Sequence, residues 1–208
     1  MITFEPEKFT MNFLAHAHLS GKNDQLLIGN FIADSVKGKD FNHFPEGIHQ
    51  GIVLHRQIDT FTDRHVYFKR SLERIRNKHG KYSGIVVDIF YDHFLAVHWR
   101  RFHEESLHHF ADHVYSLLSE NFDLLPERSK RMLPYLIQQN WLEGYANFTD
   151  LELVFYGMDR RTQLISGMRE SVKTLHENYS GLEEDFFDFY PELQHYTEKE
   201  MQLLHLDQ

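Results

Sequence analysis

Ionisable or amide side chains recur at a spacing of four residues in three segments of the first half of the chain. The pairs are Asn30 with Asp34, His55 with Asp59, and Asp88 with Asp92. On a helix this spacing places two side chains on one face, about 5–6 Å apart at Cβ. Each pair could therefore offer two nitrogen or oxygen ligands to a single ion.

The segment from Gly84 to Trp99 is apolar almost all the way round a helix, which is typical of a buried helix. On a helical wheel Asp88 and Asp92 fall on the side of Leu95, so neither carboxylate has an evident route to bulk water. Burying an ionised carboxylate is costly unless a metal, a cationic partner or protonation compensates for it. Two such carboxylates on one face favour a cation.

The segment from Gly47 to Asp63 places His55 and Asp59 on the same helical stripe as Ile52. A stripe that mixes apolar residues with histidine and aspartate predicts that these side chains face the interior. Taken alone, the pair is more often a hydrogen bond within one helix than a metal site. Asp63 could likewise cap the helix that follows.

In the segment LLIGNFIADSVKG, Asn30 and Asp34 share a sector with Lys37, with which Asp34 could simply form an ion pair. Gly29 and Ala33 lie on another sector, where small residues would allow a neighbouring helix to approach closely.

His16 and His18, in MNFLAHAHL, are further candidates for this centre, although either one alone could be an ordinary core or surface residue. Without a shared site, the inward-facing acid on each of the three helices would need a separate explanation. The three segments together therefore favour one shared metal site.

Apolar residues follow a helical period over nearly the whole chain, which predicts an all-α fold in one compact helical bundle. Residues 1–10 are expected to form an N-terminal extension, and 11–208 a single helical domain, because no linker divides the chain. Short punctuation at Gly, Pro, Asn and Asp separates the elements. The predicted helices are 11–19, 25–37, 46–61, 64–79, 83–101, 105–120, 127–147, 150–157, 160–178 and 181–203.

Composition narrows the class of protein further. The chain has 208 residues and 41% hydrophobic content, enough for a sizeable core. It contains no cysteine, so any metal must be held by nitrogen and oxygen donors, and a cytoplasmic location is expected. We find no signal peptide and no apolar run that would span a membrane. The net charge of −9 argues against a nucleic-acid partner.

One stretch is nonetheless basic. Between residues 64 and 81 the only carboxylate is Glu73, against Arg64, Lys69, Arg70, Arg74, Arg76, Lys78 and Lys81. The stretch could attract an acidic partner, or it could be a solvated helix face.

Four motifs carry a resemblance to a known family. They are MNFLAHAHL from Met11, LIGNFIADSVKG from Leu27, GIVLHRQIDTFTDRH from Gly51 and DIFYDHFLAVHW from Asp88. In this order and at these separations they resemble bacterial acyl carrier protein phosphodiesterases. Weaker likeness continues through WLEGY from Trp141, the GMDRR segment from Gly157 and DFFDFYPEL from Asp185. The alignment differs near Asp159, and the first ten residues have no counterpart in the family.

The resemblance implies an all-helical fold distantly related to the HD phosphohydrolases. It also implies a divalent metal, with Mn²⁺ as the first choice and Mg²⁺, Fe²⁺ or Co²⁺ as alternatives. The family hydrolyses the phosphodiester that joins 4′-phosphopantetheine to a serine of holo acyl carrier protein. The carrier protein would therefore be the partner, and the oligomeric state stays open.

Together the residues and the resemblance suggest roles for particular side chains. The expected metal ligands are Asp34, His55, Asp59, Asp92 and His93. Asp88 would complete or orient the shell, Arg56 or Lys37 would stabilise the phosphoryl charge, and His16 would protonate the departing serine oxygen. The acidic carrier protein would be bound by Lys37, Arg64, Lys69, Arg70 and Arg74.

Two other hypotheses use the same residues differently. In the first, an HD-like phosphohydrolase acts on a small nucleotide or phosphoester and needs no protein partner. In the second, the chain is a non-enzymatic helical binding module whose histidines and aspartates form buried hydrogen-bond networks. Metal binding distinguishes the binding module from either enzyme. The size of the substrate distinguishes the HD-like phosphohydrolase from an enzyme that acts on the carrier protein.

Overall fold

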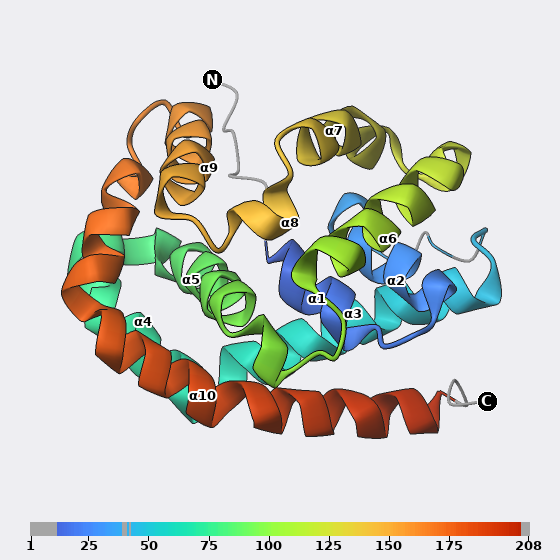
Figure 1. The fold of residues 1–208 in the computed structure, drawn as a ribbon, viewed down its shortest axis with the longest axis horizontal. Coiled ribbons are helices and arrows are strands. Elements are labelled where there is room, and N and C mark those ends of the chain that lie inside the picture. The colour runs from blue at the N-terminus through green and yellow to red at the C-terminus, as the bar shows by residue number, and fades with distance from the viewer. Residues whose placement is uncertain (1–11, 39–40, 42, 205–208) are drawn as a thin grey trace.

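The computed structural model describes residues 12–38, 41 and 43–204, and over these residues the protein is all-α with no strand, as predicted (Figure 1). The expected extension over residues 1–10 lies outside the described residues. The ten α-helices in this part are α1 Phe13–Leu19, α2 Asp24–Ile32, α3 Glu46–Arg64, α4 Val66–His79, α5 Ser83–Val97, α6 Leu107–Glu120, α7 Glu127–Gln138, α8 Trp141–Gly144, α9 Phe148–Arg161 and α10 Ser171–Leu203.

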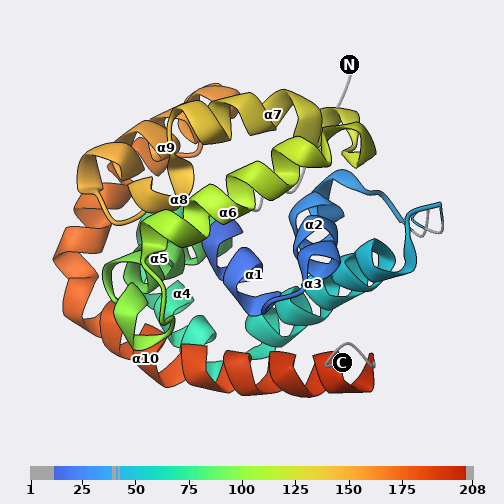
Figure 2. The same ribbon diagram turned by 45° about the vertical axis from the view of Figure 1, so that its right-hand side comes forward.

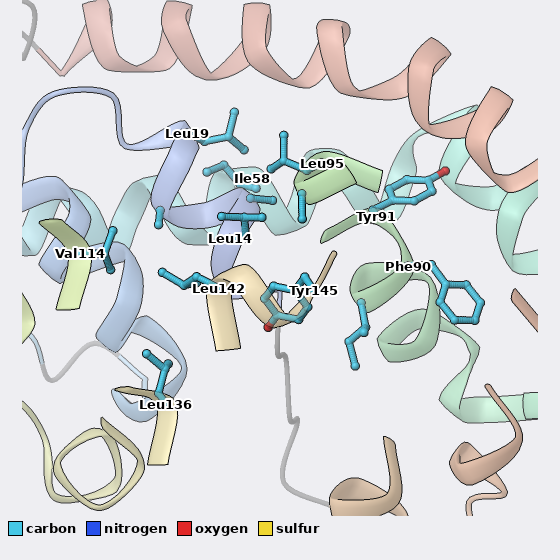
Figure 3. Close-up of a cluster of buried hydrophobic side chains, with 14 of the residues drawn as sticks. Leu14, Leu19, Ile58, Phe90, Tyr91, Leu95, Val114, Leu136, Leu142 and Tyr145 are labelled. Atoms are coloured by element: carbon cyan, nitrogen blue, oxygen red, sulfur yellow. The ribbon is translucent and has the colours of Figure 1, made fainter. Parts of the chain in front are cut away.

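The short helix α1 lies near the centre of the molecule, surrounded by longer helices (Figure 2). It packs against α2 and α5, while α10 runs along one side and contacts α3, α4 and α5. Apolar side chains from α1, α3, α5 and α8 meet in the core, with Leu14, Ile58, Leu95 and Leu142 all almost fully buried (Figure 3). No helix in the described ranges combines the length and the apolar character that crossing a membrane requires.

Helices α2 and α3 approach closely at two glycines. A Cβ atom on Gly29 would lie 2.1 Å from the carbonyl oxygen of Ile48 and 2.8 Å from Cα of Gly51. A Cβ on Gly51 would in turn lie 2.4 Å from the carbonyl oxygen of Leu26. The close approach expected at Gly29 is thus confirmed, and it brings Asn30 on α2 next to His55 on α3.

The second half of the chain departs from the predicted helix boundaries. A left-handed Asn140, with φ of 45°, separates α7 from α8 within the helix predicted over 127–147. The helix predicted from 160 is also wrong at its start, because α9 ends at Arg161. Gln163 and Leu164 then take positive φ values of 56° and 64°.

Gly181 was expected to divide two helices, but it lies inside the continuous helix α10. A close approach explains the glycine at this position, since a Cβ on Gly181 would lie 2.6 Å from a guanidinium nitrogen of Arg74 on α4. Gly181 thus gives room for a side chain, and the helix continues past it.

The basic stretch on α4 is engaged mainly with α10. The carboxylate of Asp185, which is 0% exposed, accepts hydrogen bonds from Arg70, Arg74 and Ser71. Farther along the two helices, Lys78 forms an ion pair with Glu177. Arg70 and Arg74, which the sequence predicts to bind a partner, thus neutralise a buried carboxylate within the chain, and their contact with a partner stays a prediction. Arg64 and Lys69 are exposed.

We predict that Gly29→Ala destabilises the protein and loosens its histidine-containing centre. The new methyl group would overlap backbone atoms of α3, so α2 must move away at a cost of about 1–3 kcal/mol. Urea unfolding measures the change. Gly157→Ala is the matched control on α9, because no atom lies within 4 Å of the added Cβ. There we expect a gain of about 0.5–1 kcal/mol, and equal effects of the two variants would contradict the prediction.

Replacing the buried carboxylate between α4 and α10 should also destabilise the fold. Asp185→Ala removes charge-assisted hydrogen bonds to two arginines, and we expect a loss of about 2–3 kcal/mol in the free energy of unfolding. Asp188→Ala is the control, because Asp188 is 43% exposed and pairs with Arg70 at the surface. Its effect should stay below about 1 kcal/mol. A small effect at both positions would mean that the hydrogen bonds between Asp185 and the two arginines add little to the free energy of unfolding.

Candidate metal centre

Two buried histidines from different helices share one hydrogen-bond acceptor. His16 on α1 and His55 on α3 are 3% and 5% exposed. Their Nδ1 atoms lie 2.7 Å and 2.9 Å from Oδ1 of Asn30 on α2. The two rings stack with their centroids 4.0 Å apart and an interplanar angle of 22°. As a result, both rings present Nε2 on the side away from Asn30.

Two carboxylates face these Nε2 atoms. Nε2 of His16 lies 3.3 Å from Oδ1 of Asp59, and Nε2 of His55 lies 3.4 Å from Oδ2 of the same residue. Oδ1 of Asp34 lies 3.5 Å from Nε2 of His55. Neither Nε2 atom has a hydrogen-bond partner.

The atoms that His16, His55 and Asp59 offer all lie within 4.8 Å of one another, and Asp34 adjoins them. Imidazole nitrogen and carboxylate oxygen are the donors that divalent transition metals take in cysteine-free sites. Within the described ranges, this triad can therefore hold a divalent metal ion.

The electrostatics of the site call for one positive charge. Burial alone would lower the pKa of His55, but the adjacent carboxylates of Asp34 and Asp59 outweigh it and raise this pKa to about 10. Burial would raise the pKa of Asp59, yet His16 and His55 lower it far below its usual range. The pKa of His16 is lowered by burial and by neighbouring His55. A single proton, or a metal ion in its place, satisfies the centre.

Asp92 has a different role from the metal ligand expected from the sequence. Its two carboxylate oxygens accept the backbone N–H groups of Leu14 and Ala15, at 3.0 Å and 2.8 Å, near the start of α1. Burial outweighs these hydrogen bonds and raises the pKa of Asp92 to about 8. Asp92 thus anchors the helix that carries His16, and it is absent from the ligand triad.

His93 is also placed away from the expected centre. Its Nδ1 hydrogen-bonds the carbonyl oxygen of Tyr145 at 2.8 Å, and its Nε2 lies 3.3 Å from the hydroxyl of Tyr179. Consecutive helical residues point about 100° apart, and here Asp92 points to the backbone of α1 while His93 points to Tyr145 and Tyr179. Residue spacing alone assigns no partner to either direction, so the sequence predicts both residues as ligands of one metal.

Asp88 is partly buried on α5 and belongs to the surroundings of the centre rather than to its triad. Burial raises the pKa of Asp88 well above its ordinary value, and the negative charges of Asp59 and Asp92 raise it further. The role predicted for Asp88 from the sequence, as a residue that completes or orients the shell, stays a prediction.

Arginines from two helices contact the segment that carries Asp34. Nη2 of Arg56 on α3 donates to the carbonyl oxygen of Val36, and Nη1 of Arg128 on α7 donates to that of Asp34, both at 3.3 Å. Nothing in the sequence points to Arg128, which lies far along the chain in a helix without ligand-type spacing. Lys37, at the end of this segment, is exposed.

One side of the centre is closed by apolar side chains. His16, Asn30, Asp34 and His55 line a small cavity together with residues such as Phe31 and Leu136. Its volume of about 10 Å³ holds about one water molecule. The side chains of Asp34 and Asp59 are 25% and 37% exposed. A substrate must therefore reach the centre from the side of these two carboxylates.

The fold and the centre together define a class, namely all-helical proteins with a buried histidine and aspartate centre suited to a divalent metal. Comparison with known proteins then identifies the family. Residues 11–193 match the family described as acyl carrier protein phosphodiesterase, and the chain belongs to that family. The resemblance noted from the four motifs is thereby confirmed.

Individual relatives agree with this assignment. The acyl carrier protein phosphodiesterase of Salmonella agona (strain SL483) is 33% identical over 184 residues, which is 88% of this chain and 95% of the relative. The protein of the same name from Salmonella newport (strain SL254) gives the same identity and coverage. No solved structure shows a significant match to the chain.

Metal binding at this centre should release a proton. Below pH 10 the metal-free protein keeps a proton on His55, because its pKa is raised to about 10. That proton stabilises the metal-free fold fully below pH 6.5, the ordinary pKa, and the stabilisation is lost as pH rises through about 10. A metal must displace the proton, so affinity should rise up to about tenfold per pH unit between pH 7 and 9.

Calorimetry at pH 7 in buffers of different ionisation enthalpy counts the protons released per ion, and we expect about one. His98→Gln is the control, because it removes a histidine–carboxylate pair elsewhere, in which Nε2 lies 2.7 Å from Oε1 of Glu183. This variant should leave the number unchanged. An affinity that does not vary with pH would contradict the prediction.

Proposed function

We propose that this protein hydrolyses the phosphodiester between 4′-phosphopantetheine and a serine of holo acyl carrier protein, using a divalent metal. The observation that carries the metal is the pair of partnerless Nε2 atoms facing Asp59 and Asp34. The family to which the chain belongs supports the reaction and the carrier protein as the substrate.

The proposed ligands are Nε2 of His16 and His55, with carboxylate oxygens of Asp59 and Asp34. A centre with two imidazoles and two carboxylates suits Mn²⁺, Fe²⁺ or Co²⁺, and we favour Mn²⁺ from the family resemblance. When bound, such an ion supplies a more acidic water and neutralises charge on a phosphoryl oxygen.

Arg56 and Arg128 are proposed to hold the phosphoryl group. Each guanidinium gives one N–H to the backbone around Asp34, and a guanidinium has five N–H groups in a planar fork. Their positions beside Asp34 place positive charge at the side from which the substrate must come. Such charge favours the transition state, in which negative charge on the phosphoryl oxygens grows.

Proton delivery to the serine oxygen needs a group other than His16. The Nδ1 of His16 is engaged with Asn30, and its Nε2 is a proposed metal ligand. Asp88 is the better candidate, because the raised pKa of its carboxyl favours the protonated form that can donate.

Arg56, Arg128 and Lys37 also provide the positive charge with which we expect the acidic carrier protein to dock.

Incubation of holo acyl carrier protein with the purified protein and Mn²⁺ tests the proposal directly. Mass spectrometry should show loss of the 4′-phosphopantetheine mass, and a chelator should prevent it. An unchanged carrier protein with cleavage of small phosphodiesters would instead favour the HD-like phosphohydrolase. A protein that binds no metal and cleaves neither substrate would favour the binding module.

Asp59→Asn should lower metal affinity and turnover of the carrier protein together, each by at least about 100-fold, because the amide loses the charge that both histidines face. Calorimetry with Mn²⁺ and the mass assay measure the two quantities. Asp63→Asn is the matched control, one helical turn farther along α3 at an exposed position. Equal turnover by the two variants would exclude Asp59 as a ligand.

A further inference from the structure

Asn30 is buried in the middle of the centre and makes four hydrogen bonds through its side chain. It is 1% exposed, on a helix that packs between α1 and α3. Two of the bonds run from its Nδ2 group, to the carbonyl oxygen of His16 at 2.9 Å and to Oγ of Ser20 at 3.1 Å. The other two reach its Oδ1 from the imidazoles of His16 and His55.

The orientation of the Asn30 amide follows from what its partners can do. The carbonyl oxygen of His16 can only accept a hydrogen bond, so the amide must present its N–H₂ group there. The hydroxyl of Ser20 donates to that same carbonyl oxygen at 2.9 Å, which leaves its lone pairs to accept from Asn30. In the flipped amide, oxygen would face oxygen. Oδ1 is therefore the atom that faces the histidines.

The protonation of both rings follows in turn. An amide oxygen cannot donate, so each Nδ1 at 2.7 Å and 2.9 Å from Oδ1 must carry a hydrogen. In a neutral imidazole only one nitrogen carries a hydrogen. His16, and His55 once a metal has displaced its second proton, therefore direct an Nε2 lone pair toward Asp59.

We infer that Asn30 is a positioning residue, whose single amide oxygen fixes His16 and His55 in the Nδ1–H tautomer and presents both Nε2 atoms to one metal ion. This inference rests on the proposed function only for the metal. It also removes Asn30 from the ligands that the spacing Asn30–Asp34 suggested. Oδ1 already accepts two N–H groups, and the amide nitrogen has no lone pair to offer.

Nitrogen-15 NMR of histidine-labelled protein reads the tautomers directly, in the metal-free and the Zn²⁺-loaded protein. Signals are assigned by their loss in His16→Gln and His55→Gln. We expect both rings to keep a slowly exchanging Nδ1–H in the two states, with Zn²⁺ shifting the Nε2 signals most. Nδ1 signals that lack hydrogen in the wild type would overturn the inference.

Variants of Asn30 test its role through metal affinity. Asn30→Leu keeps the approximate shape but removes the acceptor, and Zn²⁺ affinity should fall about 10- to 100-fold. Asn30→Asp keeps an acceptor for both rings, so the Nδ1–H signals should persist and affinity should remain at or above that of the wild type. Ser20→Ala is the control, because it removes only one partner of the amide nitrogen.

The outcomes separate this inference from the proposed function. Persistent Nδ1–H signals in a protein that binds no metal would support the role of Asn30 and refute the metal. Metal binding that Asn30→Leu leaves unchanged, with both Nδ1–H signals intact, would refute the role of Asn30 and leave the metal standing. If Asn30→Leu fails to fold, loss of both Nδ1–H signals in Asn30→Asp would overturn the inference, and their retention would support it.

Discussion

The need for a positive charge between two imidazole lone pairs and two carboxylates governs the centre of this protein. All four groups accept hydrogen bonds, and they face one another in a site where His16 and His55 are almost fully buried. In a low-dielectric surrounding such a set of acceptors repels itself unless a cation lies among them. A proton on His55 provides the positive charge in the metal-free protein. A divalent ion would provide it while contacting both imidazoles and both carboxylates.

The helices around the centre hold its groups against that repulsion. Asp92 anchors the start of α1, which carries His16, through two backbone N–H groups. The contact of Gly29 with Gly51 keeps α2 and α3 at a distance that no side chain would permit. Asn30 then bridges the two histidines from the helix between them. Each of these contacts fixes the position of a helix or a ring around the centre.

The long helix α10 completes the scaffold from outside. Asp185 joins it to α4 through two arginines, and its C-terminal part reaches α3, where Glu200 accepts a hydrogen bond from Gln57 at 2.5 Å. Glu200 lies beyond residue 193, where the match to the family ends. Asp185 and Glu177 of α10 thus neutralise Arg70, Arg74 and Lys78 of α4 within the chain.

The amino-acid sequence is enough to predict the all-α class, the inward direction of His55 and Asp59, and the close helix approach at Gly29. These properties depend on residue type and on the helical period, which fix the face of a helix that turns inward. The four motifs also identified the family, since their order and separations are properties of the chain alone. The sequence indicates His16 as a candidate, but it does not show that His16 stacks on His55 and faces Asp59.

The packing of the helices establishes which groups meet. It placed His16 over His55, assigned Asp92 to the backbone of α1 and His93 to two tyrosines, and gave Arg70 and Arg74 a buried partner on α10. It also brought Arg128 to the backbone of Asp34. The physical reason is that a periodic pattern records the direction of a side chain from its own helix. The residue opposite comes from a distant segment, and its identity depends on how all the helices pack.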